Sequence, residues 1–227
     1  MTARVKEAAQ SNDNIIKNKE LTDGGRDSWI QAGLQLLASS GLNSLNVESL
    51  GRYLGLSKGS FYWHFADRRE LLSAIRKAWR RREEGRFGRD GDTAMGTAER
   101  LASFLNLSSE RGQAHLELAM NAWAYSDLEA AGDVAAIEQI RMSYLERILI
   151  DMGFNHDRAA WWAAALYQAF LGVLENSARL PQVREEKEQI ADRFSWLILA
   201  AATLEDHRQD RATHELPARG RTSRRKA

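Results

Sequence analysis

The sequence predicts an all-α protein, and three observations support this fold class. Only two of the 227 residues are proline, Pro181 and Pro217, so long stretches of the chain can run as uninterrupted helix. Apolar residues recur at intervals of three and four, which places them on one face of a helix. No segment shows the alternation of apolar and polar residues that is typical of a half-buried strand. A chain of this length can form one large domain or two smaller ones.

The amino-terminal part is expected to begin with a disordered arm followed by two helices. Residues 1–22 are polar and offer too little apolar surface to pack. An apolar stripe predicts a helix at residues 26–39, and Gly41 is placed to end it. A second helix is predicted at residues 47–54, with Asn46 as its N-cap.

The segment that follows, residues 54–72 (LGLSKGSFYWHFADRRELL), is the most informative in the chain. Ser57 is suited to cap a helix, and Asp67 with Glu70 three residues later forms a capping box for another. The helix between these caps is too short to contribute much to a core, so it must present its surface. That surface offers a cation, a hydroxyl, a phenol, an indole and an imidazole, which suit contacts with phosphates and base edges.

The aromatic residues of this short helix divide into two groups. Phe61 and Phe65 are four residues apart and share one face, which we expect to fill the core. Tyr62 and Trp63 then point elsewhere, and large aromatic side chains on a cationic surface indicate a contact site. A three-helix packing unit that binds nothing is the structural alternative.

The rest of the chain is predicted to be helical, with one linker and one tail. A helix at residues 68–82 ends in three arginines, and residues 83–92 contain three glycines and are predicted to be a linker. Residues 207–227 are predicted to be a flexible basic tail. Further helices are predicted at residues 93–107, 113–125, 133–152, 158–180 and 185–206.

Charge is distributed unevenly along the chain, although the formal net charge is only +1. Residues 22–82 carry ten basic and five acidic side chains, whereas residues 83–207 carry eleven and twenty-one. Residues 208–227 carry seven basic and two acidic side chains. A basic module beside an acidic one favours an interface with nucleic acid at the basic end.

Residues 23–82 resemble the DNA-binding end of the tetracycline-repressor (TetR) family of bacterial transcriptional regulators. The resemblance rests on the motif described above and is specific because the motif is long. Asn46 stands where the family usually has threonine or serine, but it can still cap a helix and form hydrogen bonds. Gly51 stands where the family usually has alanine, at a cost of about 1 kcal/mol in helix propensity.

The resemblance implies two domains and a set of residues that contact DNA. The DNA-binding domain covers residues 23–82, with its helix-turn-helix at about residues 46–65, and an effector-binding and dimerisation domain covers residues 83–206. Trp63 is placed to approach a thymine methyl group or to pack on the sugar backbone, and the sequence leaves both open. The residues expected to contact DNA are Asn46, Ser57, Lys58, Gly59, Ser60, Tyr62, Trp63, His64 and Arg68.

The second domain is rich in aromatic residues, for which two interpretations stand. They can pack the core and a dimer interface, or some of them can line a pocket for an apolar or aromatic small molecule. The resemblance supports a pocket in this domain. Its candidate lining residues are Phe104, His115, Met120, Trp123, Tyr125, Tyr144 and Tyr167.

The last two long helices are expected to form a homodimer. Helix 158–180 has two apolar stripes, of which the core of one subunit needs only one. In the TetR family the corresponding helices of two subunits form a four-helix bundle. The expected interface residues are Trp161, Trp162, Ala165, Gln168, Gly172, Phe194, Leu197 and Ala201.

Other classes of function find little support. The chain has no cysteine and its five histidines lack ligand spacing, so we expect no metal, no cofactor and no catalytic residues. The longest apolar run, residues 159–174, is too short to span a bilayer, and no secretion signal is present at the start of this sequence. We therefore expect a cytoplasmic protein without a membrane partner.

Together these features predict a homodimeric transcriptional regulator that binds double-stranded DNA at a palindromic operator. The resemblance implies repression that a small-molecule effector relieves, through a movement of helix 68–82 that changes the spacing of the two recognition helices. The alternative is a structural DNA-binding dimer, associated with the nucleoid or with division, that has no effector. An enzyme would need a cluster of convergent polar residues that the sequence does not reveal.

Overall fold

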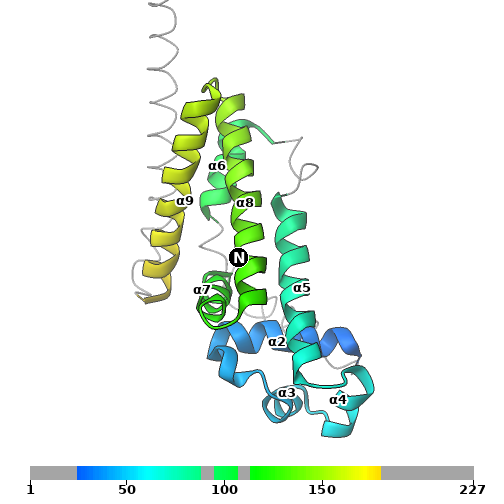
Figure 1. The fold of residues 1–227 in the computed structure, drawn as a ribbon. Coiled ribbons are helices and arrows are strands. Elements are labelled where there is room, and N and C mark those ends of the chain that lie inside the picture. The colour runs from blue at the N-terminus through cyan, green and yellow to red at the C-terminus, as the bar shows by residue number, and fades with distance from the viewer. Residues whose placement is uncertain (1–24, 88–94, 107–112, 180–227) are drawn as a thin grey trace, which may run out of the picture.

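The computed structural model describes residues 25–87, 95–106 and 113–179, and all regular structure in these ranges is helical, as predicted (Figure 1). Residues 1–22 and 207–227 and the helix predicted at residues 185–206 lie outside the described residues. The helices of the amino-terminal part are α2 (Arg26–Ser40), the 3-10 turn η1 (Leu42–Ser44), α3 (Val47–Leu54), α4 (Lys58–His64) and α5 (Arg68–Phe87). The remaining helices are α6 (Thr97–Asn106), α7 (Gln113–Ala124), α8 (Leu128–Asp151) and α9 (His156–Arg179).

The amino-terminal helices gather at one end of the molecule, and α5 leads away from them towards the other end (Figure 1). Helices α8 and α9 pack side by side, and α7 lies against α2, α8 and α9. Helix α5 packs against both α2 and α8. This helix therefore connects the amino-terminal bundle directly to the second group of helices.

The amino-terminal bundle is built around buried aromatic side chains. The rings of Trp29 and Phe61 meet edge to face at 5.3 Å, and Phe61 stacks on Phe65 at the same distance. Both phenylalanines are fully buried, which confirms the face predicted for them. The same core continues into α7 through Met120 and Trp123, so it is not closed off at the end of the bundle.

A second core lies between α6, α8 and α9, and it also receives the end of α5. Its centre is a group of packed rings. The ring centroid of Phe87 lies 5.5 Å from that of Phe104 and 5.3 Å from that of Tyr144. The ring centroids of Phe104 and Phe170 are 5.0 Å apart. The aromatic excess noted in the sequence is therefore largely explained by packing within one subunit.

A buried polar cluster lies between the two cores. The Arg141 guanidinium donates hydrogen bonds to Glu117 at 2.8 and 2.9 Å and to Glu83 at 2.7 Å. The amide of Gln113 donates to both carboxylates, and the Trp79 indole donates to Glu117 at 3.4 Å. Burial alone would lower the pKa of Arg141, but the two carboxylates outweigh it and raise the pKa above its usual value. The cluster thus fixes α5, α7 and α8 relative to one another.

Because of this cluster, residues 83–87 are helical, although the sequence predicts a linker at residues 83–92. Helix α5 does not end at residue 82 but continues to Phe87, because Glu83 is buried against Arg141 and Phe87 is buried in the second core. These tertiary contacts outweigh the low helix propensity of Gly85. The helix boundary is wrong in the sequence prediction because its stabilising partners are distant in sequence.

Helix α8 also begins earlier than predicted, at Leu128 rather than at residue 133. The side chain of Asp127 caps it by accepting a hydrogen bond from the Ala130 amide at 2.9 Å. Gly132 lies inside the helix on the exposed side, where it is tolerated. Among the described helices, none combines the length and the apolar character needed to cross a membrane.

Candidate nucleic-acid interface

Local capping and one close approach build the helix-turn-helix. Asn46 caps α3 by accepting a hydrogen bond from the Ser49 amide at 2.9 Å, and Ser57 caps α4 by accepting one from the Ser60 amide at 3.2 Å. Between the helices, Gly55 adopts a φ of +70°, a left-handed conformation that favours glycine. The two caps predicted from the sequence are therefore present.

The structure explains why residue 51 is glycine, where the TetR family usually has alanine. A Cβ atom at this position would lie 2.8 Å from the backbone oxygen of Leu56. The Leu56 amide in turn donates a hydrogen bond to the Gly51 carbonyl at 2.9 Å, which closes the turn tightly. In this chain the residue is glycine because the turn comes too close to α3 for a larger one.

Helix α4 is held by one face and presents the other. Phe61 anchors it in the core, whereas Tyr62 and Trp63 are 61% and 88% exposed. His64 is half-buried near the end of the helix. Lys58, Gly59 and the half-buried Ser60 form the first turn, next to the two exposed aromatic side chains. The predicted DNA-contacting residues of α4 therefore lie together on one short helix, with Tyr62 and Trp63 turned outward.

Lys58 is paired within the protein. Its Nζ atom lies 2.6 Å from a carboxylate oxygen of Glu48, in the first turn of α3. The hydrogen bond and the charge attraction lower the pKa of Glu48 and raise the pKa of Lys58. Glu48 was not among the residues predicted from the sequence, and its spacing of ten residues from Lys58 is not a helical one.

Arg68, at the start of α5, has a structural contact in addition to its predicted role. Its Nε atom donates a hydrogen bond to the Leu45 carbonyl at 2.5 Å, which ties α5 to the turn before α3. The capping arrangement predicted nearby is also present. The Glu70 amide donates to Asp67 at 2.8 Å, and the Glu70 carboxylate accepts from the Ala66 amide at 2.8 Å.

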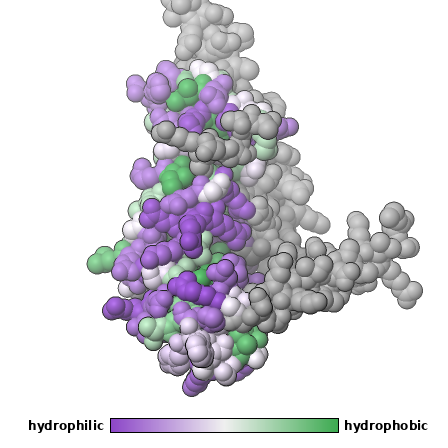
Figure 2. Space-filling model, turned by 90° about the vertical axis from the view of Figure 1, so that its right-hand side faces the viewer, coloured by the Kyte–Doolittle hydropathy of each residue, from purple (hydrophilic) through white to green (hydrophobic). Residues whose placement is uncertain are grey.

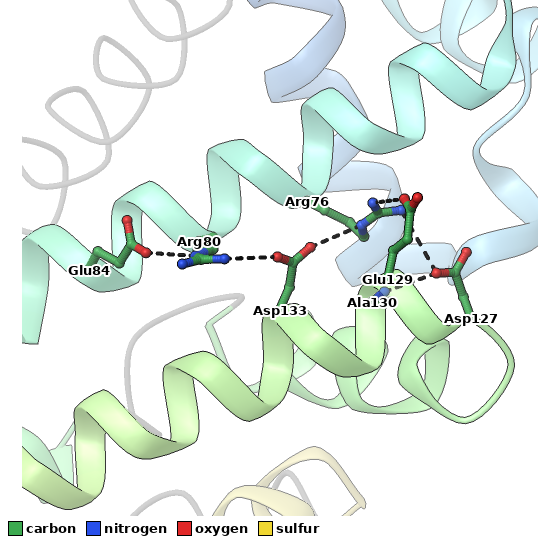
Figure 3. Close-up of polar contacts among 7 residues, drawn as sticks. All are labelled: Arg76, Arg80, Glu84, Asp127, Glu129, Ala130 and Asp133. Atoms are coloured by element: carbon green, nitrogen blue, oxygen red, sulfur yellow. Dashed lines mark hydrogen bonds and ion pairs between the residues drawn. The ribbon is translucent and has the colours of Figure 1, made fainter.

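Ion pairs join α5 to the beginning of α8 (Figure 3). Arg76, which is almost buried, pairs with Glu129 and lies 3.0 Å from Asp133. Arg80 pairs with Glu84 at 2.6 Å and lies 3.5 Å from the same aspartate. The helix that leaves the amino-terminal bundle is thus fastened to α8 along two of its turns.

An open groove follows this junction, and its lining is strongly charged. It therefore does not resemble the apolar effector pocket predicted from the sequence. The view from the α5 side agrees, since hydrophilic side chains cover the middle of that face and hydrophobic ones form small separate spots (Figure 2). The groove is lined by Ser73, Arg76, Lys77, Arg80, Arg81, Glu84, Glu129 and Asp133.

The seven candidate effector residues do not lie around one cavity. Met120 and Trp123 belong to the first core, while His115 and Tyr125 are exposed at the surface. The other three candidates are buried together in the second core. They are Phe104, Tyr144 and Tyr167. Arg141 borders the same place, with its guanidinium 5.5 Å from the ring of Phe87 and 5.9 Å from that of Phe170.

Helix α9 has one buried and one exposed stripe. The exposed stripe includes Trp161, Gln168 and Gly172, with Ala165 partly buried beside them. Trp162 is half-buried and packs edge to face on Trp161 at 5.1 Å. The stripe predicted to face a partner is therefore the one that α9 leaves accessible. The remaining predicted interface residues, Phe194, Leu197 and Ala201, lie outside the described residues.

The comparisons with known sequences agree with the position of this motif. Residues 30–75 match the family model described as bacterial regulatory proteins, tetR family. The tetracycline repressor protein class G of Vibrio anguillarum is 39% identical over 66 residues, which is 29% of this chain and 31% of that protein. The HTH-type transcriptional regulator AcrR of Shigella flexneri is 29% identical over 59 residues, or 26% and 27% of the two chains. The chain thus matches about a third or less of the length of these relatives.

Solved structures extend the likeness beyond the motif. A transcriptional regulator from Rhodococcus sp. RHA1 superposes with a TM-score of 0.65 at 20% identity, over 79% of this chain and 97% of that one. FadR of Bacillus subtilis, solved in complex with stearoyl-CoA, gives a TM-score of 0.55 at 16% identity, over 75% and 96%. At these identities the likeness establishes the fold alone. The sequence likeness to TetR-family regulators is thus concentrated in the amino-terminal helices, where the family model and the relatives match.

Proposed function

We propose that this chain is a homodimeric transcriptional repressor that binds a palindromic DNA operator through α3 and α4 and leaves it when a small molecule binds. The observation that carries the DNA-binding part is the exposure of Tyr62 and Trp63 on a helix anchored by Phe61. An exposed indole and an exposed phenol keep apolar surface in contact with water, which is unfavourable unless a binding partner covers it. The capped, basic helix start beside them suits the phosphates and base edges of a duplex.

We infer that two copies bind together, because one short helix reads only a few base pairs. The exposed stripe of α9, with Trp161, Gln168 and Gly172, supports a partner helix at that position. A two-fold dimer would place two recognition helices about 34 Å apart, the repeat of the major groove. Within this proposal the DNA-binding domain covers residues 23–82 and the effector-binding and dimerisation domain covers residues 83–206, with α5 shared between them.

The effector part of the proposal rests on the second core. Phe104, Tyr144 and Tyr167 lie together there, beside the end of α5 and the Arg141 cluster. A ligand that separates these rings would displace Phe87 and thereby move α5, which leads to the DNA-binding bundle. FadR of Bacillus subtilis, which shares the fold, is in complex with stearoyl-CoA, so an apolar or aromatic effector is the class to test first.

The DNA-binding proposal is tested with Tyr62→Ala. The binding site would first be selected from random duplexes, and affinity would then be measured at fixed salt, because salt alone changes it strongly. We expect a loss of roughly 1–3 kcal/mol in binding, typical of a specific contact. The control is Tyr125→Ala, which removes an even more exposed tyrosine just after α7 and should bind like the parent. Equal affinity of the parent and Tyr62→Ala would contradict the assignment.

The effector proposal is tested by screening apolar and aromatic compounds for thermal stabilisation, then titrating each hit with and without the operator. Linkage requires that a compound which weakens DNA binding is itself bound more weakly by the DNA complex, by the same factor. A factor of about 5–150 is typical of such coupling. If no compound stabilises the protein while the operator still binds, the structural DNA-binding dimer without an effector becomes the better description.

A further inference from the structure

The pair formed by Glu48 and Lys58 is unusual because it places a negative charge on the surface proposed to face DNA. Within α3 and α4, both fully described, Glu48 is the only acidic residue. Its side chain is 66% exposed, so the fold does not require the carboxylate at this position. A carboxylate facing the DNA polyanion lowers affinity unless it accepts a hydrogen bond from a base.

Resting on the proposed DNA-binding function, we propose that Glu48 and Lys58 act together to read one G·C base pair in each half-site. The pair joins α3 to α4 at 2.6 Å, so an acceptor and a donor lie next to each other on the exposed face. Lys58 would donate to O6 or N7 of guanine, and Glu48 would accept from the N4 amino group of the paired cytosine.

The chemistry of the groove favours G·C over A·T for this pair. In the major groove a G·C pair presents two acceptors on guanine and a donor on cytosine, which complement a lysine beside a glutamate. An A·T pair would instead bring the O4 acceptor and the methyl group of thymine towards the carboxylate. Neither of these groups can donate a hydrogen bond to Glu48. Adenine does offer a donor at N6, but it leaves Lys58 a single acceptor, N7, where guanine offers two.

The neighbours of the pair are consistent with a role in base contact. Tyr62 is near Lys58 on α4, and Arg52 is near Glu48 on α3. Lys58 has its hydrogen bond with Glu48 in the free protein, so its ammonium group is already held in position. A held donor loses less freedom on binding than an unrestrained lysine side chain.

The test compares sequence preference among full-length variants at a fixed salt concentration. Each protein would select sites from random duplexes, and its affinity would be measured for the selected site and for versions with each base pair replaced. The variants are Glu48→Gln, Lys58→Gln and the double substitution. Asp157→Asn is the control, because it removes one exposed carboxylate from the first turn of α9, and α9 begins at the opposite end of the molecule from α3 and α4 (Figure 1).

We expect the parent to lose about ten-fold or more in affinity when one particular G·C pair is replaced, within the range for a good base contact. Both single variants should lose that preference, the double variant should lose no more than either, and Asp157→Asn should keep it. If Glu48→Gln binds all sequences more tightly but keeps every preference, Glu48 only masks Lys58 and the inference is overturned. Selection of an A·T pair at the sensitive position also overturns it. A parent that selects no sequence at all would instead contradict the proposed function.

Discussion

The pair of Glu48 with Lys58 and the pair of Glu83 with Arg141 have almost the same separation, 2.6 and 2.7 Å, in opposite surroundings. The first pair is about two-thirds exposed on the proposed DNA-binding surface, whereas the second is almost completely removed from water. Water screens the first pair, so it adds little to stability. The second pair cannot open without leaving a buried charge, so it holds α5 in place.

The largest effect is expected from breaking the interior cluster with Arg141→Met. The substitution keeps a similar length but leaves the buried carboxylates of Glu83 and Glu117 without their cation. We expect the free energy of unfolding to fall by about 3–5 kcal/mol, as for other buried pairs that lose one partner. Urea denaturation at neutral pH measures this change.

Arg147→Met serves as the control for this prediction. Arg147 lies on the same helix and is less buried. Its guanidinium donates a long hydrogen bond, of 3.4 Å, to the Phe87 carbonyl. We expect this variant to lose much less stability than Arg141→Met. Equal losses for the two variants would show that the cluster has no special role in holding the helices together.

The interior also differs from the surface in its response to alkaline pH. Burial raises the pKa of Tyr167 to about 12, although Arg141 opposes this effect. In the unfolded chain a tyrosine has a pKa near 10. The folded state therefore keeps the proton over a range in which the unfolded state releases it. Stability from this group is present below pH 10 and is lost as the pH rises towards 12.

The matching experiment compares the parent with Tyr167→Phe, which has no proton to lose. From pH 10 to pH 12 the parent should lose about 2 kcal/mol more in its free energy of unfolding than the variant. Tyr125→Phe, at an exposed site, should follow the parent over the whole range. Parallel curves for the parent and Tyr167→Phe would contradict a buried, protonated phenol.

The features that the sequence predicts correctly depend on residues close together in the chain, whereas the interior cluster does not. The caps at Asn46 and Ser57 and the division of Phe61 from Tyr62 depend on residues within four positions, so local patterns predict them correctly. The cluster around Arg141 brings together side chains 24 and 58 positions apart, and no local pattern records such pairings. For this reason the sequence places Glu83 in a linker, although it is among the most buried residues of the structure.

The effector residues show a second limit of sequence reasoning. Phe104 and Tyr125 are both aromatic residues of the second domain and are both predicted to line the pocket. The first is buried, however, and the second is 94% exposed. Aromatic content alone does not distinguish a core from a pocket or from the surface, because all three use the same side chains. Only the packing of α6, α8 and α9 brings Phe104, Tyr144 and Tyr167 together.

A smaller effect is expected at the turn between α3 and α4. Gly51→Ala gains about 1 kcal/mol in helix propensity, but its Cβ would lie 2.8 Å from the Leu56 carbonyl oxygen. Because backbone cannot move aside cheaply, we expect a net loss of about 1 kcal/mol. Gly132→Ala is the control, since a Cβ there meets nothing within 4 Å and should stabilise the protein by up to about 1 kcal/mol. Thermal unfolding of both variants should give shifts of opposite sign.

The smallest effect on stability is expected from the surface pair itself. Glu48→Gln and Lys58→Gln should each unfold at nearly the melting temperature of the parent, because water replaces the lost partner on both exposed side chains. A double-mutant cycle should likewise show only weak coupling in stability. The same two substitutions are expected to change the DNA sequence preference. The surface pair would then contribute to DNA binding, whereas the interior pair contributes to the stability of the fold. A large fall in melting temperature for Glu48→Gln would show instead that the pair holds α3 and α4 together, and would remove the contrast with Arg141.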